Sequence, residues 1–306
     1  MRSTVSSERW STADIPSQTG RVALVTGANA GLGYVIAEEL ARAGATVLLG
    51  CRNKTKASAA AERIRKSGAT GPVEVLDLDL ADLGSVARAA QHVRASSRPL
   101  HLLINNAGLM ALDRSTTVDG FETQFGVNHL GHFALTAELL PVLIATDGAR
   151  VVTMSSMGHR AGKMRFDDLM HDRRYDRWRP YLQSKLANLL FTAELHRRLA
   201  LAGHKTLALA AHPGGSSTEL GKEGRGISNR LMSAVVPLMT QSATVGAQPA
   251  LRAATDPIAR GGEFYGPRWI GVGHAVLETP SARARSAADA LRLWDVSQQL
   301  TGHNFL

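Results

Sequence analysis

A tyrosine and a lysine four residues apart form the clearest chemical pair in the sequence. Tyr181 and Lys185 stand in the run YLQSKLANLLF, whose pattern predicts a helix. Residues four apart share one face of a helix, with their Cβ atoms roughly 5–6 Å apart. An adjacent ammonium favours the ionised phenol, so we expect Lys185 to lower the pKa of Tyr181 from its usual value of about 10. Such a tyrosine can exchange a proton with an alcohol or a carbonyl near neutral pH.

This spacing is common by chance, and its plain interpretation is a partly exposed tyrosine above a solvated lysine. Two neighbouring features favour chemistry instead. A β-branched strand at residues 149–154 ends in Ser155 and Ser156, and an irregular basic insert over 157–180 separates it from the helix that begins near Tyr181. The other feature is a glycine-rich turn near the N-terminus.

The N-terminal region predicts a strand, a glycine-rich turn, a helix and a second strand over residues 21–50. The glycines are Gly27, Gly31 and Gly33, spaced Gly-x-x-x-Gly-x-Gly. Glycine allows a tight turn, a close approach of backbone to phosphate and close helix packing. A βαβ unit of this kind places a pyrophosphate at a helix N-terminus, so it predicts dinucleotide binding; a glycine-rich loop without a ligand is the alternative.

Strands and helices alternate through the rest of the chain. The expected strands are 22–26, 46–49, 73–76, 100–104, 149–154, 206–211 and a short final strand within 261–267. The expected helices include 54–66, 83–95, a stretch within 116–146, and a last helix with Ala290, Leu293, Val296 and Leu300 on one stripe. This order predicts an α/β fold: a single Rossmann-type doubly wound parallel sheet of about seven strands with helices on both faces.

The domain organisation follows from composition. The chain has 306 residues and 44% apolar content, enough for one large core. We expect a polar N-terminal arm over 1–20 and a single dinucleotide-binding and catalytic domain over 21–306. On its substrate side we place the insert 157–180 and a Gly-, Ser- and Met-rich flap over 215–245.

Several other classes of protein are disfavoured. We find no signal-like segment and no run of 18 apolar residues, so we expect a cytoplasmic protein without a membrane span. Cys51 is the only cysteine, which excludes an intrachain disulfide. The histidines, among them His129, His132, His159 and His212, show no ligand spacing, and we expect no metal.

The net charge of +9 raises the question of nucleic acid. Lys and Arg are scattered except in a knot at 160–179, and no nucleic-acid motif accompanies them, so we expect no nucleic-acid partner. Part of the charge could hold a phosphorylated cofactor. We interpret the knot as a solvated insert at the rim of a pocket, or alternatively as a site for an acidic substrate or partner.

Together these motifs resemble the short-chain dehydrogenase/reductase family, single-domain branch, over about residues 20–270. The matching pieces are TGANAGLG (26–33), Asp79-Leu80, NNAG (105–108), Asn128, Ser156, the Tyr181/Lys185 pair, Pro213-Gly214 and Thr218. Within the family the chain is most similar to the retinol dehydrogenase and WW-domain oxidoreductase group and to protochlorophyllide reductases. That likeness rests on ANAGLG, CRN (51–53), YLQSKLANLLF and LWDVSQQLTG (293–302).

The resemblance implies a set of roles. Tyr181 would be the general acid or base, Ser156 would hydrogen-bond the substrate oxygen, Lys185 would lower the Tyr181 pKa and bind the nicotinamide ribose, and Asn128 would hold a water. An asparagine in an apolar helix could instead satisfy backbone locally. Implied cofactor contacts are Gly27, Asn29, Ala30, Gly31, Leu32, Gly33, Arg52, Asp79, Leu80, Asn106, Ala107, Gly108, Tyr181, Lys185, Pro213, Gly214 and Thr218.

The end of the second strand bears on cofactor choice. An acid there would bind the ribose 2′-hydroxyl of NAD, but this sequence has Gly50-Cys51-Arg52-Asn53. Arg52 could pair with a 2′-phosphate, so we favour NADP and leave NAD open. Against NADP, neither Asn29 nor Ala30 supplies the basic side chain that many NADP-dependent relatives carry.

The sequence therefore predicts an NAD(P)-dependent oxidoreductase that transfers hydride to or from a hydrophobic alcohol or carbonyl compound. Two alternatives are C=C reduction, as in protochlorophyllide reductase, and an NADP-sensing binding protein without turnover. Because family members commonly pair through the helices that carry Asn128 and Tyr181, a homodimer or homotetramer is expected. Substrate identity and reaction direction do not follow from the sequence.

Overall fold

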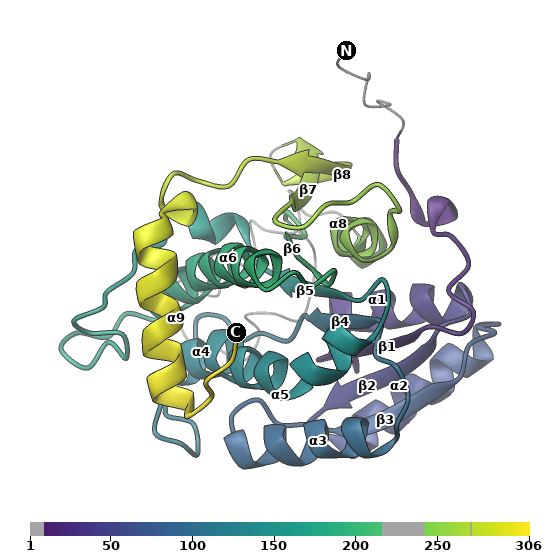
Figure 1. Cartoon of the computed structure of the whole chain (residues 1–306), viewed down its shortest axis with the longest axis horizontal. Coiled ribbons are helices and arrows are strands. Elements are labelled where there is room, and N and C mark those ends of the chain that lie inside the picture. The colour runs from purple at the N-terminus through teal and green to yellow at the C-terminus, as the bar shows by residue number, and fades with distance from the viewer. Residues whose placement is uncertain (1–8, 216–241, 270) are drawn as a thin grey trace.

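One mixed sheet with helices on both faces forms the body of the protein (Figure 1). The computed structural model describes residues 9–215, 242–269 and 271–306. Within these residues the sheet has eight strands in the order β3-β2-β1-β4-β5-β6-β7-β8. All neighbours are parallel except β7 and β8, which are antiparallel. The order reverses at β1, which lies between β2 and β4, and such a reversal leaves a crevice at the carboxyl ends of the strands.

The elements have these bounds. The strands are β1 (Val22–Thr26), β2 (Thr46–Cys51), β3 (Val73–Asp77), β4 (Leu102–Asn105), β5 (Arg150–Met154), β6 (Leu207–Ala211), β7 (Phe264–Trp269) and β8 (Val272–Glu278). The α-helices are α1 (Gly31–Arg42), α2 (Lys54–Lys66), α3 (Leu83–Ala95), α4 (Thr123–Phe125), α5 (Gly131–Ala145), α6 (Trp178–Leu201), α8 (Ala243–Thr255) and α9 (Ala287–Thr301). Short turns of other helix types are η1 (Thr12–Asp14), η2 (Gly126–Leu130), η3 (Met157–Arg160) and η5 (Arg283–Arg285).

The two faces of the sheet are covered by different helices. Because side chains alternate along a strand, Val25 faces α1, α2 and α8, whereas Leu24 faces α3, α5 and α6. Both faces of the central strands are therefore apolar, as a buried parallel sheet requires. Helix α9 packs on α6, outside the second layer (Figure 1).

The predicted doubly wound α/β fold is confirmed, and its last strand is corrected. The expected strand within 261–267 is β7, but it is not the final one, because β8 follows and raises the strand count from about seven to eight. Strand β8 lies at the edge of the sheet and buries only Ala275 fully. It therefore lacks the apolar run by which a central strand is recognised.

Two helices differ from expectation at their starts. The stretch 116–146 opens with an isolated bridge between Thr116 and Glu122, and helix begins only at Thr123. It then passes through the π-helical turn η2 before α5. Helix α6 begins at Trp178, three residues before Tyr181, and Pro180 lies in its first turn, where a missing N–H costs little.

The peripheral segments contact the body. Trp10 of the expected N-terminal arm is buried in the core cluster that contains α1 and α8. In the expected insert, Met164 and Leu169 are buried beside α6. Residues 216–241 of the expected flap lie outside the described part, and residues 243–245 belong to α8.

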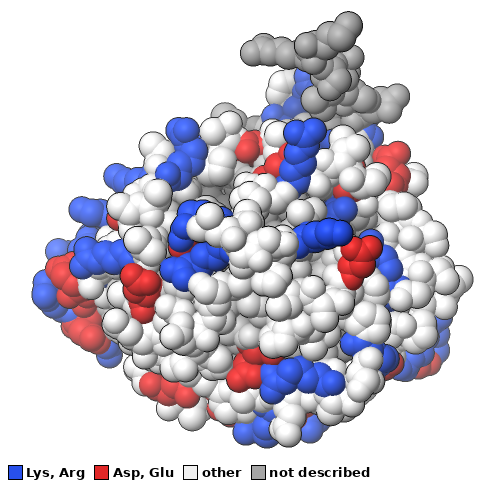
Figure 2. Space-filling view, viewed as in Figure 1, with Lys and Arg blue, Asp and Glu red and all other residues white. Residues whose placement is uncertain are grey.

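The knot at 160–179 carries acidic as well as basic groups. Arg173 pairs with Asp167 at 2.9 Å, and Arg177 pairs with Asp113 at 2.5 Å. Figure 2 shows blue and red side chains intermixed at the left edge of the molecule. Ion pairs of this kind neutralise part of the knot and connect it to the loop before α4.

Among residues 9–215, 242–269 and 271–306, one helical stretch, Thr123–Ala145, has the length and apolar composition of a membrane-crossing helix. Of its most apolar window, 72% is buried inside the fold, as in the core helix of a globular protein.

We predict that α9 depends on Trp294 for its attachment. The indole is 1% exposed, and its ring lies 5.2 Å from that of Phe133 and 4.6 Å from that of Phe305. Trp294→Ala should lower the free energy of unfolding by roughly 3–5 kcal/mol in a urea titration. Leu291→Ala, on the same helix but 45% exposed, is the control and should change it by less than about 0.5 kcal/mol. Equal effects of the two would contradict this role.

Candidate active site

Tyr181 and Lys185 lie together at the carboxyl end of β5. Both side chains come from α6 and are buried, with the Lys185 Nζ 5.8 Å from the centre of the Tyr181 ring. The Nζ donates a hydrogen bond to the main-chain oxygen of Met154, the last residue of β5, at 3.2 Å. Helix α6 thus holds its reactive face against the end of this strand.

The two serines after β5 have different partners. Ser155 Oγ is buried and donates to the main-chain oxygen of Lys185 at 2.7 Å. Ser156 is partly exposed, accepts from the Gly158 N–H at 3.1 Å, and shares a side-chain hydrogen bond with Tyr181. Ser156 is therefore the serine whose hydroxyl faces the tyrosine.

The electrostatics of the pair differ from the sequence-based expectation. Burial raises the pKa of Tyr181 above its usual value, and the hydrogen bond with Ser156 offsets only part of that rise. Burial also lowers the pKa of Lys185 to about 8. The expected depression of the phenol pKa is wrong for this arrangement, because desolvation of the phenolate is the largest cause of the shift.

Asn128 connects the tyrosine helix to the loop after β4. It lies in the π-helical turn η2, and its Oδ1 accepts from the Leu109 N–H at 2.7 Å. Its Nδ2 donates to the Leu109 oxygen at 3.0 Å and to Ser184 Oγ at 2.9 Å. The side chain therefore satisfies the backbone of a distant loop and not, as one alternative had it, backbone close to it in the chain. A methyl group on Gly108 would lie 3.3 Å from Lys185 Nζ and 3.4 Å from Asn128 Oδ1, so these three residues meet.

The glycine turn is shaped for an anionic group. Gly27 and Gly31 have positive φ angles of 66° and 56°. A Cβ on Gly33 would lie 2.5 Å from the Gly27 oxygen, so only glycine fits where α1 crosses the turn. The N-cap of α1 is Ala30, which offers no side-chain cap, and its first turn has no acidic residue. The free N–H groups there suit the pyrophosphate of a dinucleotide.

The NNAG loop packs against this turn. Asn106 Nδ2 donates to the Thr26 oxygen at 2.8 Å, and the N–H groups of Asn106 and Ala107 both donate to Thr26 Oγ1 at 2.9 Å. Gly27 approaches so closely that an added Cβ would lie 3.0 Å from the Ala107 Cα. The glycine turn and the NNAG loop, both predicted to contact a dinucleotide, are thus in contact with each other.

The remaining predicted contacts lie at other strand ends. Asp79 follows β3, and its carboxylate accepts from the Ala81 N–H at 2.9 Å, while Leu80 is buried. Gly214 follows β6 with a φ of 69° and donates to His212 Nδ1 at 3.1 Å. The structure places Asn29 and Leu32 in the glycine turn and α1, Arg52 directly after β2, and Pro213 after β6. Thr218 lies outside the described residues.

Sequence reasoning missed one basic residue near the glycine turn. Arg63 of α2 donates to the Asn29 oxygen at 3.4 Å, and its guanidinium lies 4.4 Å from the centre of the Tyr34 ring. Arg52, the predicted phosphate contact, is exposed at the neighbouring strand end. Nothing in the spacing of Arg63 on an amphipathic helix marks it as a contact of the turn.

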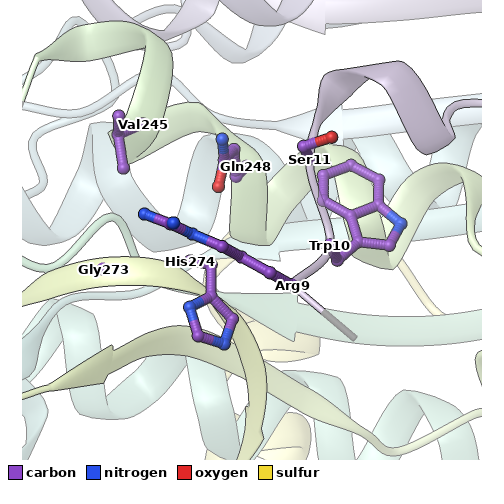
Figure 3. Close-up of a pocket in the computed structure, with 7 residues that line it drawn as sticks. All are labelled: Arg9, Trp10, Ser11, Val245, Gln248, Gly273 and His274. Carbon is purple, nitrogen blue, oxygen red and sulfur yellow. The ribbon is translucent and has the colours of Figure 1, made fainter. Parts of the chain in front are cut away.

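A separate pocket lies away from these residues. Its volume is about 330 Å³, and its lining includes Arg9, Gln248 of α8 and His274 of β8 (Figure 3). None of the predicted site residues lines it.

Comparison with known proteins decides the family. The sequence pattern of the short chain dehydrogenases matches residues 21–226. Retinol dehydrogenase 12 of Mus musculus is 42% identical over 288 residues, which are 92% of this chain and 87% of that protein. The chain belongs to the short-chain dehydrogenase family. Like its family members, this short-chain dehydrogenase is an NAD(P)-dependent oxidoreductase that acts on CH–OH and C=O groups of small molecules.

Solved structures agree with that assignment. An uncharacterised protein of Mycobacterium paratuberculosis is 45% identical, with a TM-score of 0.82 over 98% of this short-chain dehydrogenase and 100% of that chain. A protein of Beutenbergia cavernae, designated an NAD(P)-dependent gluconate 5-dehydrogenase, is 27% identical, with a TM-score of 0.66 over 82% of this chain and 96% of its own. That structure contains NADP at low occupancy.

The buried ammonium predicts a pH-dependent stability. Because burial lowers the pKa of Lys185 from 10.5 to about 8, the folded state holds fewer protons than the unfolded state between these values. Stability relative to Lys185→Met should therefore rise by roughly 3 kcal/mol as the pH increases from neutral to 10.5. Denaturant titrations of both proteins across this range measure the difference, with Lys205→Met as the control at an exposed lysine. A constant difference between wild type and Lys185→Met would show that the ammonium is not desolvated.

Proposed function

We propose that this protein is an NADP-dependent alcohol and carbonyl oxidoreductase for hydrophobic substrates, with Tyr181 as the general acid or base. One observation carries the proposal: Tyr181, Ser156, Lys185 and Asn128 converge at the carboxyl ends of β4 and β5, next to Gly108. The glycine turn that suits a dinucleotide lies beside them, at the reversal of the strand order.

The cofactor would bind along this crevice. The turn at 27–33 and the first N–H groups of α1 receive the pyrophosphate, and the loop 105–108 with Pro213 and Gly214 supplies further walls. Lys185 would be the donor for the nicotinamide ribose. A bound nicotinamide would supply the hydride chemistry at the substrate carbon.

Tyr181 is the proposed proton donor to the substrate oxygen. Because burial raises the pKa of Tyr181, its hydroxyl stays protonated near neutral pH and is a donor to the oxygen of a carbonyl substrate. Ser156 Oγ fixes that oxygen with a second hydrogen bond. The Lys185 ammonium is charged below about pH 8 and stabilises the phenolate that remains. These protonation states favour carbonyl reduction at neutral pH.

A hydrophobic substrate is supported by the relatives and by the lining of the site. Retinol dehydrogenase 12 of Mus musculus, at 42% identity, is named for an apolar alcohol. Met110 and Met157, after β4 and β5, are both partly exposed where a substrate would approach Tyr181. We propose a retinoid-like alcohol or aldehyde as the substrate class. A cytoplasmic location and a homodimeric or homotetrameric state stay predictions.

NADP is supported by the charges at the end of β2. Arg52 is exposed there, and Arg63 lies against the same turn. Asp77, which lies opposite Cys51 on the neighbouring strand, pairs with Lys54 at 2.9 Å. A 2′-phosphate would therefore meet guanidinium groups and no uncompensated carboxylate.

The alternative of C=C reduction finds no support. Protochlorophyllide reductases rely on cysteines near their pocket, but Cys51 is buried in β2 against the turn, where burial raises its thiol pKa to about 11. An activity assay distinguishes the proposed enzyme from the other alternative, an NADP-binding protein without turnover.

Tyr181→Phe tests the function directly. The variant lacks the only hydroxyl proposed to donate the proton, so kcat should fall by roughly 10²–10⁴-fold. The assay follows NADPH absorbance with aldehydes, ketones and alcohols of graded size, and Tyr175→Phe in the insert is the matched control. A Tyr181→Phe enzyme as fast as wild type would refute the mechanism, and tight NADPH binding by wild type without turnover of any substrate would favour the sensor.

Arg52→Ala tests cofactor choice. Loss of a charge-assisted hydrogen bond to the 2′-phosphate should raise the KM for NADPH by roughly tenfold or more and leave the KM for NADH nearly unchanged. Lys66→Ala removes an exposed positive charge at the far end of α2 and should affect neither. Equal changes for the two cofactors would refute the assignment of Arg52.

A further inference from the structure

His132 is a buried histidine that the proposed chemistry does not use. It lies on α5, one turn after Asn128, and is 1% exposed. Its Nε2 lies 2.8 Å from Thr26 Oγ1, and its Nδ1 lies 3.1 Å from the main-chain oxygen of Asn128. The ring therefore spans from the end of β1 to the turn that carries Asn128.

The bonds of Thr26 determine which ring nitrogen carries the proton. A threonine hydroxyl has one proton and two acceptor sites. Thr26 Oγ1 accepts from the N–H groups of Asn106 and Ala107, each at 2.9 Å, which uses both acceptor sites. Its proton has two possible acceptors, the Ile104 oxygen at 3.4 Å and His132 Nε2 at 2.8 Å, and the shorter contact is the better bond. His132 Nε2 is therefore an acceptor.

The second nitrogen is then the donor. With Nε2 unprotonated, a neutral imidazole carries its proton on Nδ1, which donates to the Asn128 oxygen. Burial, with a smaller contribution from the positive charge of Lys185, lowers the pKa of His132 to about 4, so the ring stays neutral at physiological pH. Every polar atom of this chain of bonds has a partner, and its direction is fixed.

This series of hydrogen bonds joins the two halves of the site. At one end, Thr26 holds the NNAG loop against the glycine turn. At the other, the Asn128 side chain bonds Ser184 Oγ, which donates to the main-chain oxygen of Tyr181 at 2.7 Å. His132 is the side chain that connects Thr26 to Asn128.

We propose that His132 is a positioning residue: its neutral imidazole, protonated on Nδ1, fixes the distance between the cofactor-binding turn and the Asn128–Tyr181 side of the active site. The inference rests on the proposed function, because it assigns those two sides to cofactor and proton transfer. It differs from a packing role, in which the ring would matter only for its volume.

Two substitutions test the two hydrogen bonds of the His132 ring one at a time. His132→Asn places an amide donor where Nδ1 was and cannot reach Thr26, whereas His132→Gln places an amide oxygen near the position of Nε2 and leaves the Asn128 oxygen without its side-chain donor. His132→Asn should raise the NADPH Kd, measured by fluorescence titration, by roughly tenfold, more than it lowers kcat. His132→Gln should lower kcat by roughly tenfold, more than it raises the NADPH Kd.

The matched control is His129→Gln. His129 is equally buried in the same helical region but bonds Ser297 of α9 at 2.8 Å, so its substitution should lower thermal stability without a split between Kd and kcat. If NADPH affinity and kcat fell in parallel in both His132 variants, in proportion to their loss of stability, the result would overturn the inference in favour of a packing role.

Substitutions of Thr26 provide a second test if a His132 variant does not fold. Thr26→Val removes the proton that Thr26 donates to His132 and also the acceptor of the Asn106 and Ala107 N–H groups, whereas Thr26→Ser keeps all three bonds. Thr26→Ser should therefore bind NADPH at least roughly tenfold more tightly than Thr26→Val. Equal affinities would overturn the inference. Tyr181→Phe separates this result from the proposed function: an inactive Tyr181→Phe enzyme with no split at His132 refutes only the role of His132, and an active one refutes the function itself.

Discussion

Burial of the Lys185 ammonium is the constraint on which the rest of the site depends. A charged group in the interior loses its hydration, and the depression of its pKa to about 8 corresponds to roughly 3 kcal/mol at neutral pH. The Met154 oxygen and the Tyr181 ring partly offset this loss. Both come from regular elements, so the cation holds α6 and the end of β5 in one arrangement.

The strand order of the sheet reverses at β1, and the loop after the adjacent strand β4 brings Gly108 close to the Lys185 ammonium. There the loops after β1 and β4 are close enough for a single hydroxyl, Thr26 Oγ1, to bind two N–H groups of the neighbouring loop. Gly33 and Gly108 then provide space that any side chain would fill. The glycine turn and the buried cation therefore both adjoin the loop after β4, where backbone and small residues form the surface.

The features that depend on local sequence pattern were predicted correctly. Apolar runs placed β1 to β7 within a few residues, and the spacing of Gly27, Gly31 and Gly33 located the turn. Prediction failed where the outcome depends on tertiary contacts. Strand β8 has no apolar run because it lies at the edge, and the raised pKa of Tyr181 follows from burial that spacing does not reveal. The contacts of Arg63 and His132 likewise join elements far apart in the chain. Thr218 and most of the expected flap stay predictions.

Because η2 is a π-helical turn, the geometry of the site depends on the number of residues in Gly126–Leu130. Such a turn contains one residue more than an α-helical turn, and here that extra residue lets Asn128 face the loop after β4 while α5 keeps its apolar side on the sheet. Deleting any single residue from Gly126–Leu130 would allow a regular helix, but one side of the deletion would rotate by roughly 100° relative to the other. Either the Asn128 amide would leave the loop after β4 or the packing of α5 on the sheet would be lost, so the number of residues in η2 is constrained as well as their identity.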